Sequence, residues 1–175
     1  SRIRPECPKL RDLDGKADAD AEMLWANILG MRGIRLNPSF ANTWREHHNP
    51  DGSINWEAWA KRFTAFLEPA KPGTLKGFFS FTGLDWSGDL DKWLAEKHPD
   101  AEQRKQAIAE SKQRYLTEYA REAKKLGVTI WEPINEPDLS MPPEKYIEDI
   151  LKSQYPAVKA GNPEANFLGG SLCGL

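Results

Sequence analysis

The chain has few of the residues that bind metals or build disulfide scaffolds. Its 175 residues include two cysteines, Cys7 and Cys173, and three histidines. The cysteines have no metal-ligand spacing, and a disulfide needs Cα atoms within about 7 Å of each other, which sequence does not determine. His47 and His48 are adjacent, and neighbouring side chains rarely point at one ion. We therefore expect free thiols, no metal site and no cofactor.

An excess of one charge and a long apolar run are also missing. The formal net charge is -2, the pI is near 6.0, and the charged residues, 29% of the chain, are mixed in sign. A protein that binds nucleic acid needs a basic patch for most of its affinity. No apolar run approaches the roughly 18 residues of a membrane span, and no signal peptide precedes Ser1. We therefore expect neither nucleic acid nor a membrane as a partner.

The sequence also lacks nucleotide-binding loops and internal repeats. Neither Gly-x-Gly-x-x-Gly nor Gly-Lys-Ser/Thr follows any segment with strand character, and Gly169-Gly170 falls within an expected strand. These absences disfavour a doubly wound nucleotide-binding domain. The length fits one ordinary domain but is below the about 250 residues of a complete (β/α)8 barrel.

What the sequence does contain is an alternation of helical and strand patterns. Helices are expected over 18–31, 55–67, 101–126 and from 144 onward. Asn55 is a candidate N-cap, and Pro156 should kink or break the last helix. Strands are expected over 33–37, 77–82, 128–135 and 166–172, polar loops over 38–55 and around 84–89, and an irregular arm over 1–17. The alternation predicts an α/β fold with a parallel sheet and right-handed crossovers.

The segment Trp131-Glu132-Pro133-Ile134-Asn135-Glu136-Pro137 is the most informative part of the chain. It combines an apolar, strand-like run with an Asn-Glu-Pro end and follows the longest expected helix. A carboxylate at the C-terminal end of a parallel strand is where sugar-cleaving enzymes place a general acid. Asn-Glu-Pro also ends strands as a simple turn. The strand before it and the helix before that favour the catalytic interpretation, because a motif gains weight from its context.

The motif resembles the fourth-strand motif of the clan A glycoside hydrolases, nearest to the β-xylosidase and iduronidase type of family. This resemblance implies a partial (β/α)8 TIM barrel with about four parallel strands, the second to the fifth, and with the C-terminal strands missing. Residues 18–175 would then form the N-terminal portion of a glycosidase domain. It also implies that Glu136 is the general acid/base and that the nucleophile, a Glu on a later strand, lies outside this chain.

The same resemblance implies that Asn135 forms a hydrogen bond to the 2-hydroxyl of the sugar. It makes Arg35, on the 33–37 strand, a residue that steadies the nucleophile, while a structural pair of Arg35 with Glu132 explains this arginine equally well. One departure is Ile134, where many relatives have Trp.

Three further residues follow expected strands and are candidates for substrate binding. Trp44 and Trp86 would stack on sugar rings, although a loop Trp that covers apolar core is about as common. Asp85, like Asp138, fits substrate binding or a loop cap.

The sequence therefore predicts hydrolysis of O-glycosidic bonds in oligo- or polysaccharides with retention of configuration. Its expected partners are a carbohydrate substrate and the missing half of the barrel or another chain, and the expected location is extracellular. These residues alone should be catalytically silent, because the second carboxylate is absent. The alternative is a non-catalytic carbohydrate-binding fragment or scaffold.

Overall fold

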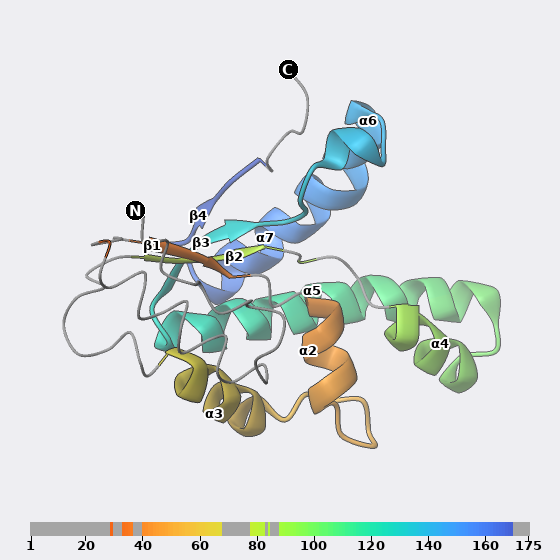
Figure 1. Ribbon diagram of the computed structural model, residues 1–175. Coiled ribbons are helices and arrows are strands. Elements are labelled where there is room, and N and C mark those ends of the chain that lie inside the picture. Colours follow the sequence, from red (N-terminus) through yellow and green to blue (C-terminus); the bar gives the residue numbers. More distant parts are fainter. Residues whose placement is uncertain are drawn as a thin grey trace, which may run out of the picture.

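The computed structural model describes residues 29, 33–36, 40–67, 78–82, 84 and 88–169 (Figure 1). Four short strands are present: β1 (Gly33–Leu36), β2 (Phe78–Thr82), β3 (Val128–Glu132) and β4 (Asn166–Phe167). The α-helices are α2 (Phe40–His47), α3 (Trp56–Leu67), α4 (Gly88–Lys97), α5 (Ala101–Lys125), α6 (Pro143–Lys145) and α7 (Lys152–Gly161). A 3₁₀ turn, η3 (Pro137–Leu139), follows β3, and a π-helix, η4 (Tyr146–Leu151), joins α6 to α7.

The strands form a small parallel sheet in the order β1-β2-β3-β4. Arg35 of β1 lies opposite Ser80 of β2, and Thr82 of β2 lies opposite Glu132 of β3. The register between β2 and β3 shifts just before Ser80, and β4 contributes only two residues to its ladder with β3. Because all strands run in one direction, the segments that leave their carboxyl ends meet at one edge of the sheet.

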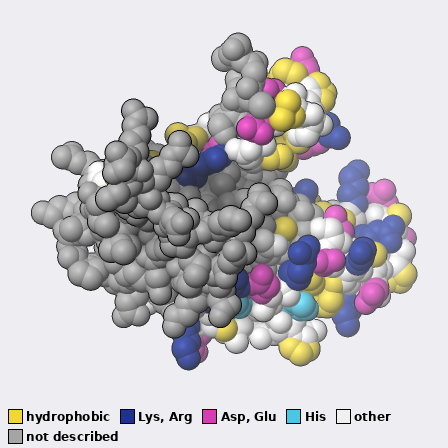
Figure 2. All heavy atoms as spheres, viewed as in Figure 1, with side chains coloured by type: hydrophobic (Ala, Val, Ile, Leu, Met, Phe, Trp, Pro, Cys, Tyr) yellow, Lys and Arg dark blue, Asp and Glu magenta, His cyan; other side chains and the backbone are white. Residues whose placement is uncertain are grey.

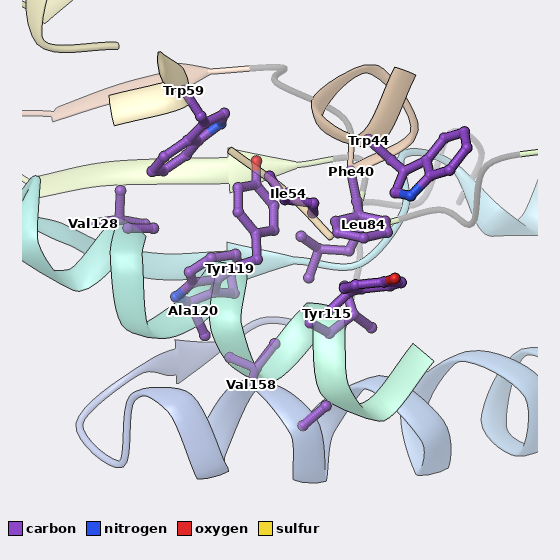
Figure 3. Close-up of a cluster of buried hydrophobic side chains, with 14 of the residues drawn as sticks. Phe40, Trp44, Ile54, Trp59, Leu84, Tyr115, Tyr119, Ala120, Val128 and Val158 are labelled. Atoms are coloured by element: carbon purple, nitrogen blue, oxygen red, sulfur yellow. The ribbon is translucent and has the colours of Figure 1, made fainter. Parts of the chain in front are cut away.

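Aromatic side chains fill the core between the sheet and the helices α2, α3 and α5 (Figure 3). Tyr119 of α5 lies at its centre, with ring centroids 5.3 Å from Trp131, 5.4 Å from Trp59 and 5.7 Å from Phe40. All four side chains are fully buried, and burial raises the pKa of Tyr119. Tilted and edge-to-face rings at these distances are the favoured aromatic geometry, so the cluster fixes the position of β3 over α5.

Helix α7 lies directly against α5 and thereby places β4 beside β3. The Thr117 hydroxyl donates to the Ala157 carbonyl at 3.1 Å, and Gln113 Nε2 donates to the Ser153 carbonyl at 2.8 Å. At Gly161 the two helices approach so closely that a Cβ atom would lie 2.1 Å from the Thr117 carbonyl oxygen. Only glycine permits this helix contact.

Several local predictions are confirmed. The long helix expected over 101–126 is α5, with its apolar face buried. Asn55 caps α3 by accepting from the Ala58 amide at 2.9 Å. Within the segment expected as a polar loop, the chain turns through a bond from the Gly52 amide to the Asn49 carbonyl, with Gly52 at φ 85°.

The predicted fold class, a partial (β/α)8 barrel with about four parallel strands, is wrong. The protein is mostly helical where it is described, its strands make only a small sheet, and no barrel of four parallel strands is seen there. The reason is that strands of two to five residues bury little surface of their own, whereas helix packing on α5 supplies most of the core.

Other boundaries also differ from the expectations. The polar loop predicted over 38–55 contains α2, and the segment after the 84–89 loop contains α4, which was not expected. The strands predicted over 128–135 and 166–172 end at Glu132 and Phe167. The predicted break at Pro156 is wrong, since this proline lies inside α7, which follows the π-helix η4.

Some expectations fall outside the described residues. They are the arm over 1–17, the helix over 18–31 apart from the exposed Leu29, and the state of Cys7 and Cys173. On the face seen in Figure 2, basic and acidic side chains are interspersed over the surface of α4 and α5, as the mixed charge of the sequence indicates.

Candidate active site at the ends of β1 and β3

Arg35 and Glu132 form the central contact of the candidate site. Their partners on β2, Ser80 and Thr82, are two positions apart, so all four positions share one face of the sheet. The Arg35 side chain crosses β2, and its Nε donates to Glu132 Oε2 at 2.7 Å. Two strands that are not adjacent in the sheet are thereby joined on the face that carries the candidate site.

The environment of this ion pair is asymmetric. The Glu132 side chain is 5% exposed, whereas the Arg35 side chain is 48% exposed. The hydrogen bond to Glu132 raises the pKa of Arg35; burial opposes this, and the negative charges of Glu132 and Glu136 add to it. The guanidinium therefore stays charged and lies within electrostatic reach of both carboxylates.

Asn135 is bound by the same arginine. Arg35 Nη2 donates to Asn135 Oδ1 at 2.7 Å, and the asparagine side chain is exposed. Because the amide oxygen is directed toward Arg35, the orientation of the whole amide group is fixed. We call Arg35, Glu132, Asn135 and Glu136 the Arg35 cluster.

Glu136 has an unusual backbone. It is the one non-glycine residue with a positive φ in the part of the chain that the structure describes, with φ 49° and ψ 55°. It also precedes Pro137, and a residue before proline is disfavoured in helical conformations. Backbone strain of this kind persists where the surroundings enforce it and is concentrated at functional sites. Glu136 is half-buried, and its negative charge acts on the guanidinium of Arg35.

Tyr146, the first residue of η4, lies within electrostatic reach of Glu132. Its hydroxyl donates to the Gly169 carbonyl beyond β4. Burial raises the pKa of Tyr146, and the negative charge of Glu132 raises it further. The sequence analysis missed this residue. The available signal was weak, because a tyrosine near a helix start has no spacing that links it to the β3 motif.

The other predicted site residues do not join the cluster. Trp44 lies in α2, is 2% exposed and stacks on His48 with ring centroids 4.1 Å apart. It is therefore a core residue in this structure, and the prediction that it lies in a loop is wrong. Asp85 and Trp86 fall outside the described residues. Asp138 is exposed in η3, two residues after Glu136.

Comparison of the chain with protein-family models, with curated proteins and with solved structures finds no match. Across the described ranges, no group of three or more His, Cys, Asp or Glu side chains is arranged to hold a metal ion. Within the same ranges, no helix combines the length and apolar character needed to cross a membrane.

Proposed function

We propose that this chain supplies the general acid/base and substrate-binding residues of a retaining glycoside hydrolase. The observation that carries the proposal is the Arg35 cluster, in which one arginine holds Glu132 and Asn135 beside the strained Glu136. The proposal rests on this site and on the Asn-Glu-Pro motif, and it does not rest on the fold, since a fold alone does not define a function.

Glu136 is the residue of the cluster that suits proton transfer. Its carboxyl would donate a proton to the glycosidic oxygen as the bond to the anomeric carbon breaks and a second carboxylate attacks that carbon. In the second step Glu136 would take a proton from the water that hydrolyses the glycosyl intermediate. Half-buried at the edge of the sheet, Glu136 has the access to solvent and substrate that both steps require.

Glu132 does not suit the role of the second carboxylate. It is 4% exposed and bonded to Arg35, so a sugar carbon cannot reach it without loss of the ion pair. We therefore assign Glu132 to holding Arg35 in place. As the resemblance of the Asn-Glu-Pro motif implies, we propose that the nucleophile comes from outside this chain. Asn135, fixed through its oxygen, would donate from Nδ2 to the 2-hydroxyl of the sugar, an interaction that strengthens in the transition state.

The test compares Glu136→Gln with the unsubstituted protein in the assembly that includes the nucleophile. Hydrolysis of a natural oligosaccharide should fall about 10² to 10⁴-fold, the usual loss for a missing general acid. An aryl glycoside with an activated leaving group should lose much less in its glycosylation step, because that group departs without a proton. Glu144→Gln, the same change at an exposed glutamate of α6, is the control and should keep near-normal rates. Wild-type rates for Glu136→Gln on the natural substrate would refute the assignment.

A non-catalytic carbohydrate-binding chain is the second candidate. One observation in its favour is the exposed side chain of Asn135, which suits sugar binding. Another is the ion pair of Glu132 with Arg35, because it leaves Glu136 as the one carboxylate of the cluster suited to reaction. Saturable binding of oligosaccharide that is lost in Asn135→Ala, together with no hydrolysis in any assembly, would select this candidate.

A further inference from the structure

The turn after β3 is tied by a backbone hydrogen bond to the segment that follows β2. The Leu84 amide donates to the Pro133 carbonyl at 2.8 Å, just beyond Thr82 and Glu132, the last ladder pair of β2 and β3. Leu84 itself is anchored, because its side chain is 1% exposed and belongs to the core cluster that Figure 3 shows. The core thus holds the amide that holds the start of the turn.

This bond fixes a rotation that the covalent chain leaves open. The ring of Pro133 fixes its own φ, and a residue before proline, here Glu132, is restricted toward extended conformations. Rotation about the ψ angle of Pro133 remains, and it swings the carbonyl together with the peptide plane that leads to Ile134. Since that carbonyl accepts from Leu84, the direction in which the chain leaves β3 is set.

The direction matters because Arg35 holds the chain on both sides of Pro133. Its side chain bonds Glu132 directly before the proline and Asn135 two residues after it, each at 2.7 Å. The donors of a guanidinium have a fixed fork geometry, so the two bonds form together only for a limited range of turns between their acceptors. A backbone held at Pro133 keeps the acceptors at the spacing that one guanidinium spans.

We propose that Leu84 is a positioning residue for the Arg35 cluster. Its buried side chain holds its amide, the amide holds the Pro133 carbonyl, and the fixed turn presents Asn135 to the guanidinium. Leu84 acts through these residues and does not touch the reacting atoms. The consequence for catalysis rests on the proposed function, whereas the effect on the bond between Arg35 and Asn135 does not.

The experiment removes the Leu84 N–H alone and measures how fast the Arg35 Nε–H proton exchanges with water, by NMR of the ¹⁵N-labelled chain. The α-hydroxy analogue of leucine, introduced at position 84 by stop-codon suppression, turns the amide bond before it into an ester and leaves the side chain in place. Exchange should become about two- to tenfold faster, the range for one lost hydrogen bond. The matched control is the same replacement at Leu126, the amide of which donates to the Ala123 carbonyl at 3.0 Å, and it should leave the rate unchanged.

A second background shows whether Leu84 acts through Asn135. Asn135→Ala alone should also accelerate exchange, and the ester at position 84 should then add little, because the contact that it positions is already gone. Equal acceleration by the ester in both backgrounds would mean that it merely loosens the fold, and this result would overturn the inference. An unchanged rate in the ester protein would overturn it too, whatever Glu136→Gln does to hydrolysis.

Side-chain variants test the anchor without an ester. Leu84→Ala should accelerate exchange, whereas Leu84→Met, which nearly conserves the volume, should keep a rate close to that of the unsubstituted protein. Leu90→Ala, the same truncation at a fully buried residue of α4, is the control, and equal acceleration by both alanine variants would contradict the positioning role. Faster exchange in the ester protein together with normal hydrolysis by Glu136→Gln would support the inference and refute the proposed function. In an active assembly, the ester should lower kcat with little change in KM.

Discussion

The pair of Arg35 and Glu132 should show strong energetic coupling in a double-mutant cycle. The variants are Arg35→Met, Glu132→Gln and their combination. Arg35→Met leaves a carboxylate that is 5% exposed without the guanidinium it contacts at 2.7 Å. Removal of one partner of a buried pair is costly, because the remaining charge has lost both water and its counter-charge.

The magnitude follows from the geometry and the exposure. Two unit charges about 4 Å apart attract by about 4 kcal/mol at an effective dielectric constant of about 20. Because the Arg35 side chain is 48% exposed, solvent screening should reduce this to about 2 kcal/mol. The bond from Arg35 to Asn135 adds about 1 kcal/mol, so Arg35→Met should cost about 3 kcal/mol in the free energy of unfolding. The coupling energy between the two sites should be about 2 kcal/mol.

Urea unfolding followed by circular dichroism provides the assay, with the four proteins compared at equal m-values. The control cycle is Glu148 with Lys152, an i,i+4 pair on η4 and α7 at 2.5 Å with side chains 62% and 63% exposed. That pair should couple by only about 0.3 to 0.5 kcal/mol. If the effects of Arg35→Met and Glu132→Gln add to within about 0.5 kcal/mol, the pair does not hold the site together as we describe.

Three further predictions concern substrate recognition, packing and pH. Asn135→Ala should reduce kcat on sugars with a 2-hydroxyl much more than on 2-deoxy analogues, as steady-state kinetics with both substrates would measure; equal losses would make the asparagine structural. Gly161→Ala should lower the free energy of unfolding by about 1 to 3 kcal/mol, because the new Cβ atom would meet the Thr117 carbonyl. Gly88→Ala is the control. A Cβ atom there would have no atom within 4 Å, so the free energy of unfolding should change by less than about 0.5 kcal/mol. Burial lowers the pKa of His47 below 6.5, so the unfolded chain takes up a proton first and stability should fall as pH drops from about 6.5 toward that lowered pKa. Urea midpoints at several pH values should show this slope reduced in His47→Gln, and an unchanged slope would contradict it.

The sequence predicted local structure best where one short-range cause decides it. Asn55 caps α3 because its side chain reaches an amide three residues on, and the apolar spacing of Tyr115, Leu116 and Tyr119 specifies the buried face of α5. Helix α2 was missed because its polar residues and adjacent histidines resemble a loop. The signal was present, since Phe40, Thr43 and Trp44 are spaced for one helical face and all three are buried.

Whether the strands close into a barrel could not be predicted from the same patterns. Alternating helices and strands specify neighbours along the chain, whereas closure of a barrel depends on the number, tilt and stagger of strands that are distant in sequence. The four strands found here are too short to dominate a core that is made by the helices around Tyr119.

The candidate site was predictable in part. The sequence offered two interpretations of Arg35, and one of them was an ion pair with Glu132. That pair was predictable because a buried acid on a strand needs a cationic partner, and the structure contains it. The bond from Arg35 to Asn135, the positive φ of Glu136 and the position of Tyr146 depend on where β3 ends and how the chain turns after it. These are tertiary features, and no spacing in the sequence encodes them.

The most direct test of the central claim, that Glu136 is the acid/base of a retaining glycosidase, is azide rescue of Glu136→Ala. With an activated aryl glycoside, the variant assembly should form the glycosyl intermediate but hydrolyse it slowly, because no base activates water. Azide needs no base, so it should accelerate turnover and yield a glycosyl azide with the anomeric configuration of the substrate, which NMR would identify. Hydrolysis of aryl and natural glycosides by Glu136→Ala at the wild-type rate, with no glycosyl azide formed, would contradict the account.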